Sequence, residues 1–194
     1  MKLRKSSRGL MIVLSSPSGG GKTTVSKKLL ARDRNIVRSV SCTTREPRAG
    51  EKNGRDYFFV TPAKFQSMIS QGAFLEWAKV HQHRYGTPRR WVEAQLRKGK
   101  DVLFVIDVQG GTALKRKNPE ALLLFLQPPS FGVLRQRLVG RQTNSSADMK
   151  VRLADARWEL REGRRYDYRV VNDRLGQAVS DILKIIRKER LLRG

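Results

Sequence analysis

Three consecutive glycines followed by a lysine and two threonines form a segment whose residue types can bind phosphate. The segment reads Ser16-Pro17-Ser18-Gly19-Gly20-Gly21-Lys22-Thr23-Thr24. Glycines let the backbone curl so that successive N–H groups point at an anion, which also faces the positive end of the following helix. Lys22 would reach the β- and γ-phosphates, and the Thr23 hydroxyl would bind a Mg²⁺ ion that bridges them. We therefore predict a phosphate loop at residues 16–24.

The residues on either side place this loop between a strand and a helix. The apolar run 10–14 is typical of a buried parallel strand, and Val25, Leu29 and Leu30 keep a helical spacing after the glycines. Ser16 departs from the usual pattern, which has a glycine five positions before Gly21. The alternative is an ordinary Gly-Ser turn, but the strand-to-helix context favours the phosphate loop.

A second group of hydroxyl and guanidinium side chains lies between residues 39 and 57. It includes Ser41, Arg45, Arg48 and Tyr57. Arginine side chains match phosphate oxygens with paired hydrogen bonds, and hydroxyl groups add neutral donors. Pro47 and Gly50 would bend the chain so that the two arginines converge. This pattern indicates a site for a monophosphate, and a solvated basic loop is the alternative.

The elements that must position these groups alternate between strands and helices. Apolar runs at 10–14, 102–106, 122–126 and 169–171 predict strands of an α/β domain around a parallel sheet. Thr61-Pro62 and Thr87-Pro88 each predict a hydroxyl N-cap before a first-turn proline, and Gly72 and Gly99 predict the ends of those two helices. The apolar stripe within 175–186 predicts a closing amphipathic helix that packs on the core.

Composition predicts one domain with anionic partners. The chain has 194 residues, of which 39% are hydrophobic, and this length suits a single core. Its 41 Lys and Arg residues against 17 Asp and Glu give a formal charge of +24, which favours nucleotide, nucleic acid or acidic membrane as a partner.

Several classes of protein are excluded or disfavoured. No apolar run reaches the roughly 18 residues of a membrane span, and the apolar stretch after the basic segment 1–8 is too short for a signal peptide. Cys42 is the single cysteine, so an internal disulfide and a multi-cysteine metal site are excluded. We expect a cytoplasmic chain in which Cys42 is packed, and in which His81 and His83 lie at the surface without a third metal ligand.

Seven motifs occur in an order and at spacings that are found together in one enzyme family. They are the phosphate loop and the segments 41–51, 72–78, 85–87, 106–110, 128–130 and 170–173. In these motifs the chain resembles the guanylate kinases, from about residue 9 to about residue 190. The resemblance implies transfer of the γ-phosphate of ATP to GMP, which gives ADP and GDP, with Mg²⁺ as cofactor.

The resemblance also implies which residues bind the two nucleotides. For ATP they are Ser16, Pro17, Ser18, Gly19, Gly20, Gly21, Lys22, Thr23, Thr24 and Asn172, the last near adenine. For the GMP phosphate they are Ser41, Arg45, Arg48, Tyr57 and Tyr85, and for guanine they are Glu76, Thr87 and Asp107. A buried carboxylate suits guanine because guanine carries N1–H and 2-amino donors that adenine lacks. The alternatives are that Glu76 only pairs with an arginine and that Thr87 only caps a helix.

Arginines near the end of the chain are expected to meet the charge of the transferred phosphoryl group. In the family that the chain resembles, arginines at the positions of Arg137, Arg141 and Arg152 lie on or beside a mobile lid, and together with Lys22 they are the predicted catalytic residues. The chain departs from the family at Val105, where an acidic residue is common. If that acidic group helps to hold water bound to magnesium, Thr23 and the phosphates must do more here, and Asp107 would combine a role at guanine with one around the magnesium.

We therefore predict a P-loop NTPase-type three-layer α/β fold in one domain over residues 9–190, with a central parallel sheet. The core would comprise 9–38, 89–129 and 166–190, a GMP-binding insertion would comprise 39–88, and a helical lid would comprise 130–165. One alternative is a scaffold module that binds phosphopeptides without a phosphate loop, and Lys22 and Thr23 argue against it. The other is nucleic-acid binding as a side activity of the high positive charge. No membrane partner is expected.

Overall fold

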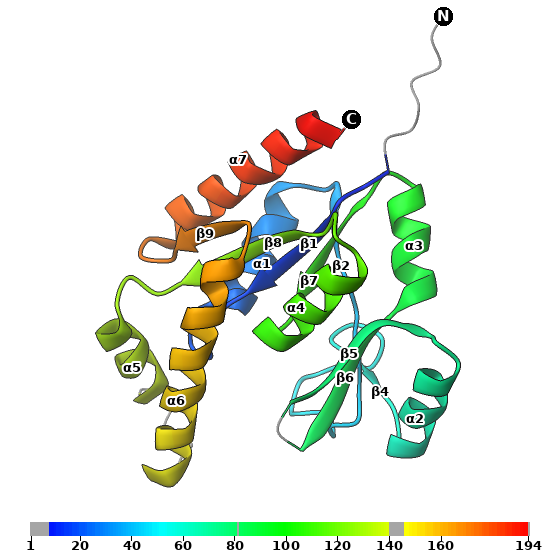
Figure 1. Cartoon of the computed structure of the whole chain (residues 1–194), viewed down its shortest axis with the longest axis horizontal. Coiled ribbons are helices and arrows are strands. Elements are labelled where there is room, and N and C mark those ends of the chain that lie inside the picture. Colours follow the sequence, from blue (N-terminus) through cyan, green and yellow to red (C-terminus); the bar gives the residue numbers. More distant parts are fainter. Residues whose placement is uncertain (1–7, 81, 140–145, 194) are drawn as a thin grey trace, which may run out of the picture.

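Five parallel strands form the central sheet of the computed structural model, which describes residues 8–80, 82–139 and 146–193 (Figure 1). Their spatial order is β2-β7-β1-β8-β9. The strands are β1 (Met11–Ser15), β2 (Ile36–Arg38), β7 (Asp101–Val105), β8 (Leu122–Gln127) and β9 (Tyr168–Val171). Every residue of β1 is buried, as expected for an apolar strand whose sheet has helices on both faces.

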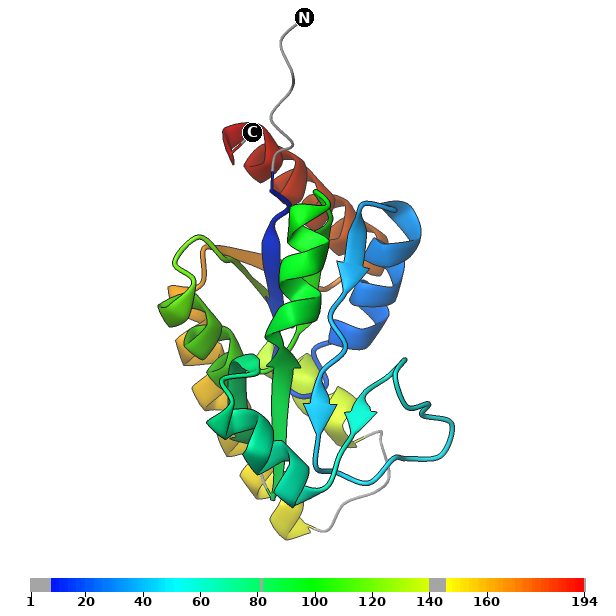
Figure 2. The ribbon, with the colours of Figure 1, turned by 90° about the vertical axis from the view of Figure 1, so that its right-hand side faces the viewer.

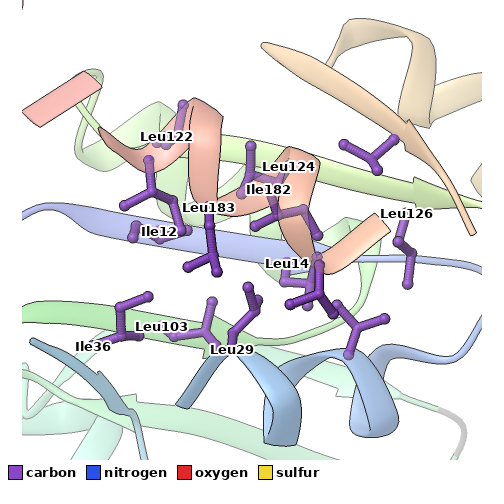
Figure 3. Close-up of a cluster of buried hydrophobic side chains, with 14 of the residues drawn as sticks. Ile12, Leu14, Leu29, Ile36, Leu103, Leu122, Leu124, Leu126, Ile182 and Leu183 are labelled. Atoms are coloured by element: carbon purple, nitrogen blue, oxygen red, sulfur yellow. The ribbon is translucent and has the colours of Figure 1, made fainter. Parts of the chain in front are cut away.

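Helices cover the two faces of this sheet and make a three-layer core. On one face, α1 (Lys22–Arg32) and α7 (Leu175–Arg193) supply Leu29, Ile182 and Leu183, which pack on Ile12 and Leu14 of β1 (Figure 3). On the other face, α3 (Arg89–Arg97) and α4 (Val108–Lys117) pack on the alternate residues of the same strands. Because successive strand residues point to opposite faces, one apolar run serves both layers.

A second, smaller sheet lies at one end of the central sheet (Figures 1 and 2). It has four strands in the order β4-β3-β6-β5. They are β3 (Cys42–Thr43), β4 (Phe58–Phe59), β5 (Phe74–Val80) and β6 (His83–Pro88), and α2 (Pro62–Ser70) packs beside them. Phe65 of α2 stacks on Phe74 with ring centroids 4.6 Å apart, and buried Cys42 joins the same cluster.

Two further helices lie at the same end of the central sheet, on the other side of its strand tips (Figure 1). They are α5 (Phe131–Val139) and α6 (Ser146–Glu162), and a 3-10 turn, η1 (Gly163–Arg165), returns the chain to β9. Leu134, Leu138 and Ala156 hold the pair together. The phosphate loop, which follows β1, therefore emerges between this helical pair and the small sheet.

The predicted core elements are confirmed, with small shifts at their ends. The strands predicted at 10–14, 102–106, 122–126 and 169–171 occupy 11–15, 101–105, 122–127 and 168–171. Thr61 caps α2 as predicted, since its side chain accepts a hydrogen bond from Lys64 N at 3.2 Å. The closing helix continues beyond the predicted stripe to Arg193. In the described part of the chain, we find no helix with the length and apolar character needed to cross a membrane.

The prediction that Thr87 caps the next helix is wrong. Helix α3 begins at Arg89, its N-cap residue is Pro88, and no side chain of the described residues caps it. The Thr87 hydroxyl instead donates to Glu76 Oε1 at 2.6 Å. The reason is that Thr87 lies within β6, whose pairing with β5 sets it opposite Glu76 rather than at the start of the helix.

Candidate active site

The phosphate loop curls tightly between β1 and α1. Gly19 and Gly21 have φ angles of 81° and 94°, in the left-handed region that favours glycine. The N–H of Gly20 donates to the Pro17 carbonyl at 2.9 Å and closes the curl. Helix α1 begins at Lys22, and no described side chain caps its first turn. Backbone N–H groups at the start of this helix can therefore receive an anion.

Ser16 shows why the departure from the usual loop pattern is tolerated. Its side chain is buried, and its Oγ donates to the Pro17 carbonyl at 3.0 Å. A methyl group at Gly20 would lie 2.6 Å from Ser16 Oγ, so the serine fills the space beneath Gly20. The hydroxyl is satisfied within the turn, and the glycines nearest Lys22 keep the curl.

The concave side of the loop is a cavity of about 200 Å³. Its wall consists of Ser16, Pro17, Ser18, Gly19, Gly21, Lys22, Thr23 and Thr24. The structure thus brings the predicted loop residues together around one space, and buried Gly20 lies behind it. Lys22 folds back over the loop and donates from Nζ to the Ser16 carbonyl at 2.5 Å.

A neighbouring inner cavity, also of about 200 Å³, connects the loop lysine to the small sheet. Five predicted residues line it together with Lys22, namely Ser41, Tyr57, Glu76, Tyr85 and Asp107. Val105 is also in its wall, so the position that is often acidic in the family here presents an apolar surface. Residues from three separate stretches of the chain therefore share one cavity with the phosphate loop.

Glu76 lines this cavity and forms a buried polar pair with Thr87, a predicted site residue that is fully buried and does not itself line the cavity. They face each other across β5 and β6, and Thr87 Oγ1 donates to Glu76 Oε1 at 2.6 Å. Ser41 Oγ lies 3.4 Å from Thr87 Oγ1 and extends the chain of polar groups. Burial raises the pKa of Glu76 to about 7, and the Thr87 hydroxyl opposes the rise while the Asp107 carboxylate adds to it. The Glu76 carboxylate has lone pairs that can accept further hydrogen bonds from within the cavity.

Arg45 and Arg48 are organised by one carboxylate but face different spaces. The Arg45 guanidinium pairs with Glu51 at 2.9 Å and lies 5.4 Å from the centre of the Tyr57 ring. Glu51 Oε2 also accepts the backbone N–H of Arg48 at 2.8 Å. Arg45 therefore lies beside the tyrosines of the inner cavity, whereas the Arg48 side chain lines an outer cavity. Against the effect of burial, the charges of both arginines lower the pKa of Glu51, so the two guanidinium groups lie near one carboxylate.

Asp107 lies where the cavities meet the central sheet. It is the N-cap of α4 and accepts the N–H of Gly110 on Oδ1 at 2.7 Å. This cap fixes the carboxylate at the tip of β7, in the walls of both the inner and the outer cavity. Sequence analysis predicted Asp107 at this site but did not identify its capping role.

The outer cavity, of about 460 Å³, lies between the small sheet and α6. Arg48 faces it from the small-sheet side and Arg152 from α6, and Lys22 and Asp107 form part of its wall. Arg137, on α5, lies at the base of the loop and donates to the Asn172 carbonyl at 3.2 Å. Arg141 lies outside the described residues.

Three residues of α6 in the outer cavity were missed by sequence analysis, and they are Asp155, Trp158 and Glu159. Burial raises the pKa of Glu159 to about 7, and the charge of Lys22 and the backbone N–H of Ser18 oppose that rise. Because Lys22 and Ser18 belong to the phosphate loop, Glu159 lies close to the loop. The spacing of Arg152, Asp155 and Glu159 places them on one face of a helix, and this signal was available in the sequence.

Comparison with known proteins agrees with this geometry. The family model for guanylate kinase matches residues 8–189. A guanylate kinase of Thermotoga maritima is 46% identical over 183 residues, which are 94% of this chain and 88% of that protein. One from Wolbachia pipientis wMel is 47% identical over 186 residues, 95% of this chain and 92% of that protein.

The fold agrees as well. The crystal structure of guanylate kinase from Anaplasma phagocytophilum superimposes with a TM-score of 0.79 at 38% identity, covering 94% of this chain and 87% of that one. The family model, the relatives and the fold all agree with the site found in this chain, where the phosphate loop shares a cavity with a buried carboxylate. The chain therefore belongs to the guanylate kinase family and is a kinase with a P-loop NTPase-type fold.

Proposed function

We propose that the enzyme transfers the γ-phosphate of ATP to GMP, giving ADP and GDP, as a step in purine nucleotide metabolism. One observation carries the proposal. Lys22 of the phosphate loop lines the same inner cavity as the buried carboxylate of Glu76, so a donor phosphate and a purine acceptor can be held side by side. Such positioning is most of what an enzyme contributes to phosphoryl transfer.

Guanine is the base that the inner cavity fits best. Glu76 is 3% exposed and its carboxylate can accept from the N1–H and 2-amino groups of guanine. Adenine would place a lone pair against the same oxygens and leave a buried acceptor unpaired. The Thr87 hydroxyl has a single proton, so it would give up its bond to Glu76 in order to donate to guanine O6. Asp107 lines the inner cavity as a further acceptor.

The GMP phosphate would bind at the tyrosine side of the inner cavity. Ser41, Tyr57 and Tyr85 line that side, and Arg45 is held next to Tyr57 by Glu51. Phosphate can replace Glu51 as the partner of the Arg45 guanidinium, because both anions accept paired hydrogen bonds. Arg48, in the outer cavity, would approach the phosphate on the side of ATP.

The ATP phosphates would bind in the phosphate loop, with Asn172 behind the loop and the lid arginines around it. Magnesium fits this arrangement, because the exposed Thr23 hydroxyl lines the loop cavity and oxygen ligands suit this ion. A bound Mg²⁺ would neutralise charge on the β- and γ-phosphates. The described residues contain no cluster of three or more acidic, histidine or cysteine side chains that could hold a metal. Phosphate oxygens and water must therefore complete the coordination.

The side chains that face the two cavities would carry the transfer itself. Lys22 and Arg152 both line the outer cavity and would meet charge on the transferred group. Arg137, which bonds Asn172, and Arg141, outside the described residues, complete the predicted set. Closure of α6 toward the small sheet would narrow the outer cavity and exclude water from the reacting phosphates.

A nucleotide panel tests the proposal most directly. ADP release from ATP is measured with GMP, AMP, UMP or CMP as acceptor, and GMP is expected to be used far faster than the others. Glu76→Gln should lower kcat/KM for GMP by about 10- to 100-fold, because the amide presents a donor to the donors of guanine. Glu120→Gln, at an exposed carboxylate, is the matched control. Equal rates with GMP and AMP in the unchanged enzyme would refute the assignment of guanine.

A further inference from the structure

Asn172 is held rigidly between the central sheet and the phosphate loop. Its backbone N–H donates to the Gln127 carbonyl at 2.8 Å, which ties the residue to the end of β8. The residue is 7% exposed, and its side-chain Nδ2 donates to the Gly20 carbonyl at 2.9 Å. The side-chain amide therefore bonds the loop backbone from behind, on a strand end that is itself fixed.

The contact is tight enough to define the shape of the loop. A methyl group at Gly21 would lie 2.5 Å from Asn172 Nδ2, so the amide packs directly against the Gly20–Gly21 peptide. Gly21 has a φ of 94°, and glycines on both sides of a peptide allow it to rotate at little cost. Without a partner, that peptide could turn its carbonyl toward the bound phosphates.

The hydrogen bond to Gly20 decides which way the neighbouring N–H points. In a planar trans peptide, the carbonyl oxygen and the following N–H point in opposite directions. When Asn172 holds the Gly20 carbonyl, the Gly21 N–H is directed away from Asn172, and Gly21 itself lines the cavity on the concave side of the loop. Aligned N–H groups are what makes such a loop an anion site, and a carbonyl in their place would repel phosphate.

The same residue also contacts the helical lid. Its main-chain carbonyl accepts a hydrogen bond from Arg137 at 3.2 Å. Asn172 thus connects the phosphate loop to one of the predicted catalytic arginines through two different groups, the side-chain amide for the loop and the carbonyl for the arginine.

We propose that Asn172 is a positioning residue that orients the Gly20–Gly21 peptide for phosphate binding, in addition to any contact with the donor base. The inference rests on the proposed function only in that the loop binds the polyphosphate of the donor. It predicts that loss of the side-chain amide weakens binding of every polyphosphate, whether or not it carries adenine.

The experiment compares ATP with inorganic tripolyphosphate, which has no base, using Asn172→Ala and Asn172→Asp. Calorimetric titration in the presence of Mg²⁺ should show that both ligands bind about 10-fold more weakly to Asn172→Ala, by a similar factor. Asn172→Asp keeps the volume beside Gly21, but at neutral pH its carboxylate cannot donate to the Gly20 carbonyl, so the loss should be at least as large. The KM for GMP should stay within about twofold of its original value.

Controls and contrary outcomes are distinct. Asp173→Asn, at the exposed neighbouring residue, should leave tripolyphosphate binding unchanged, and thermal melts should show that the variants are folded. Weaker ATP binding with unaltered tripolyphosphate binding would overturn the inference and make Asn172 a reader of the base. Unaltered binding of both ligands would also overturn it. The titrations contain no acceptor, so they do not depend on whether GMP is the substrate.

Discussion

Glu76 should make the folded enzyme less stable as the pH rises, and its replacement by glutamine should remove this loss of stability. Glu76 is 3% exposed, and burial raises the pKa of its carboxyl group from an ordinary value of 4.5 to about 7. One pKa unit corresponds to about 1.36 kcal/mol, so ionising this group in the folded protein costs about 3 kcal/mol. A glutamine at this position does not ionise and so avoids this cost, and its amide oxygen can still accept a hydrogen bond from the Thr87 hydroxyl.

The direction of the effect follows from proton binding. Between pH 4.5 and about 7 the folded state keeps the Glu76 proton that the unfolded chain has released. Stability is therefore lost as the pH rises through this range, and the loss is complete above the folded pKa. Glu76→Gln should be more stable than the unchanged enzyme by up to about 3 kcal/mol at pH 8, but by only about 1 kcal/mol at pH 5.

Urea unfolding at pH 5 and pH 8 measures this difference. At pH 8 the midpoint for Glu76→Gln should rise by about 1–2 M urea. Glu120→Gln removes the same charge from an exposed site, so it corrects for the change in a formal net charge of +24. A gain that is equal at both pH values, or a loss at pH 8, would refute the reasoning. The variant should combine higher stability with poorer use of GMP, which a simple folding defect cannot produce.

Three further predictions concern single residues. Lys22→Ala should abolish turnover but keep the thermal midpoint within a few degrees, because the Lys22 side chain lines the cavities rather than the hydrophobic core, and a coupled ADP assay with a thermal melt checks both. Gly163→Ala should lower the free energy of unfolding, measured with urea, by about 1–3 kcal/mol, because the new methyl group would lie 2.5 Å from the Phe125 ring. Gly176→Ala, where the methyl group enters open space, should not lower it. Cys42, buried with a pKa raised to about 11, should react with a thiol reagent at pH 8 only after denaturation, and rapid reaction of the folded enzyme would contradict its packing.

Local patterns in the sequence determined the core of the fold and the phosphate loop. Apolar runs gave the strands of the central sheet within one residue at each end, with the exception of β2, because burial on both faces requires continuous hydrophobic residues. The loop could be predicted because phosphate binding depends on backbone conformation, and the glycines at 19–21 indicate that conformation directly. Motif resemblance then supplied the order of the remaining site residues.

Tertiary structure decided how individual polar side chains are used. The sequence allowed Thr87 either to cap a helix or to serve the site, and only the pairing of β5 with β6 placed it 2.6 Å from Glu76. Asn172 lies 152 positions from Gly20 in the chain, so no local pattern could reveal their hydrogen bond. Backbone preference and burial are properties of short segments, whereas a hydrogen bond between distant side chains exists only once the layers have packed. For that reason the sequence by itself predicted a phosphate site, and the fold decided which groups surround it.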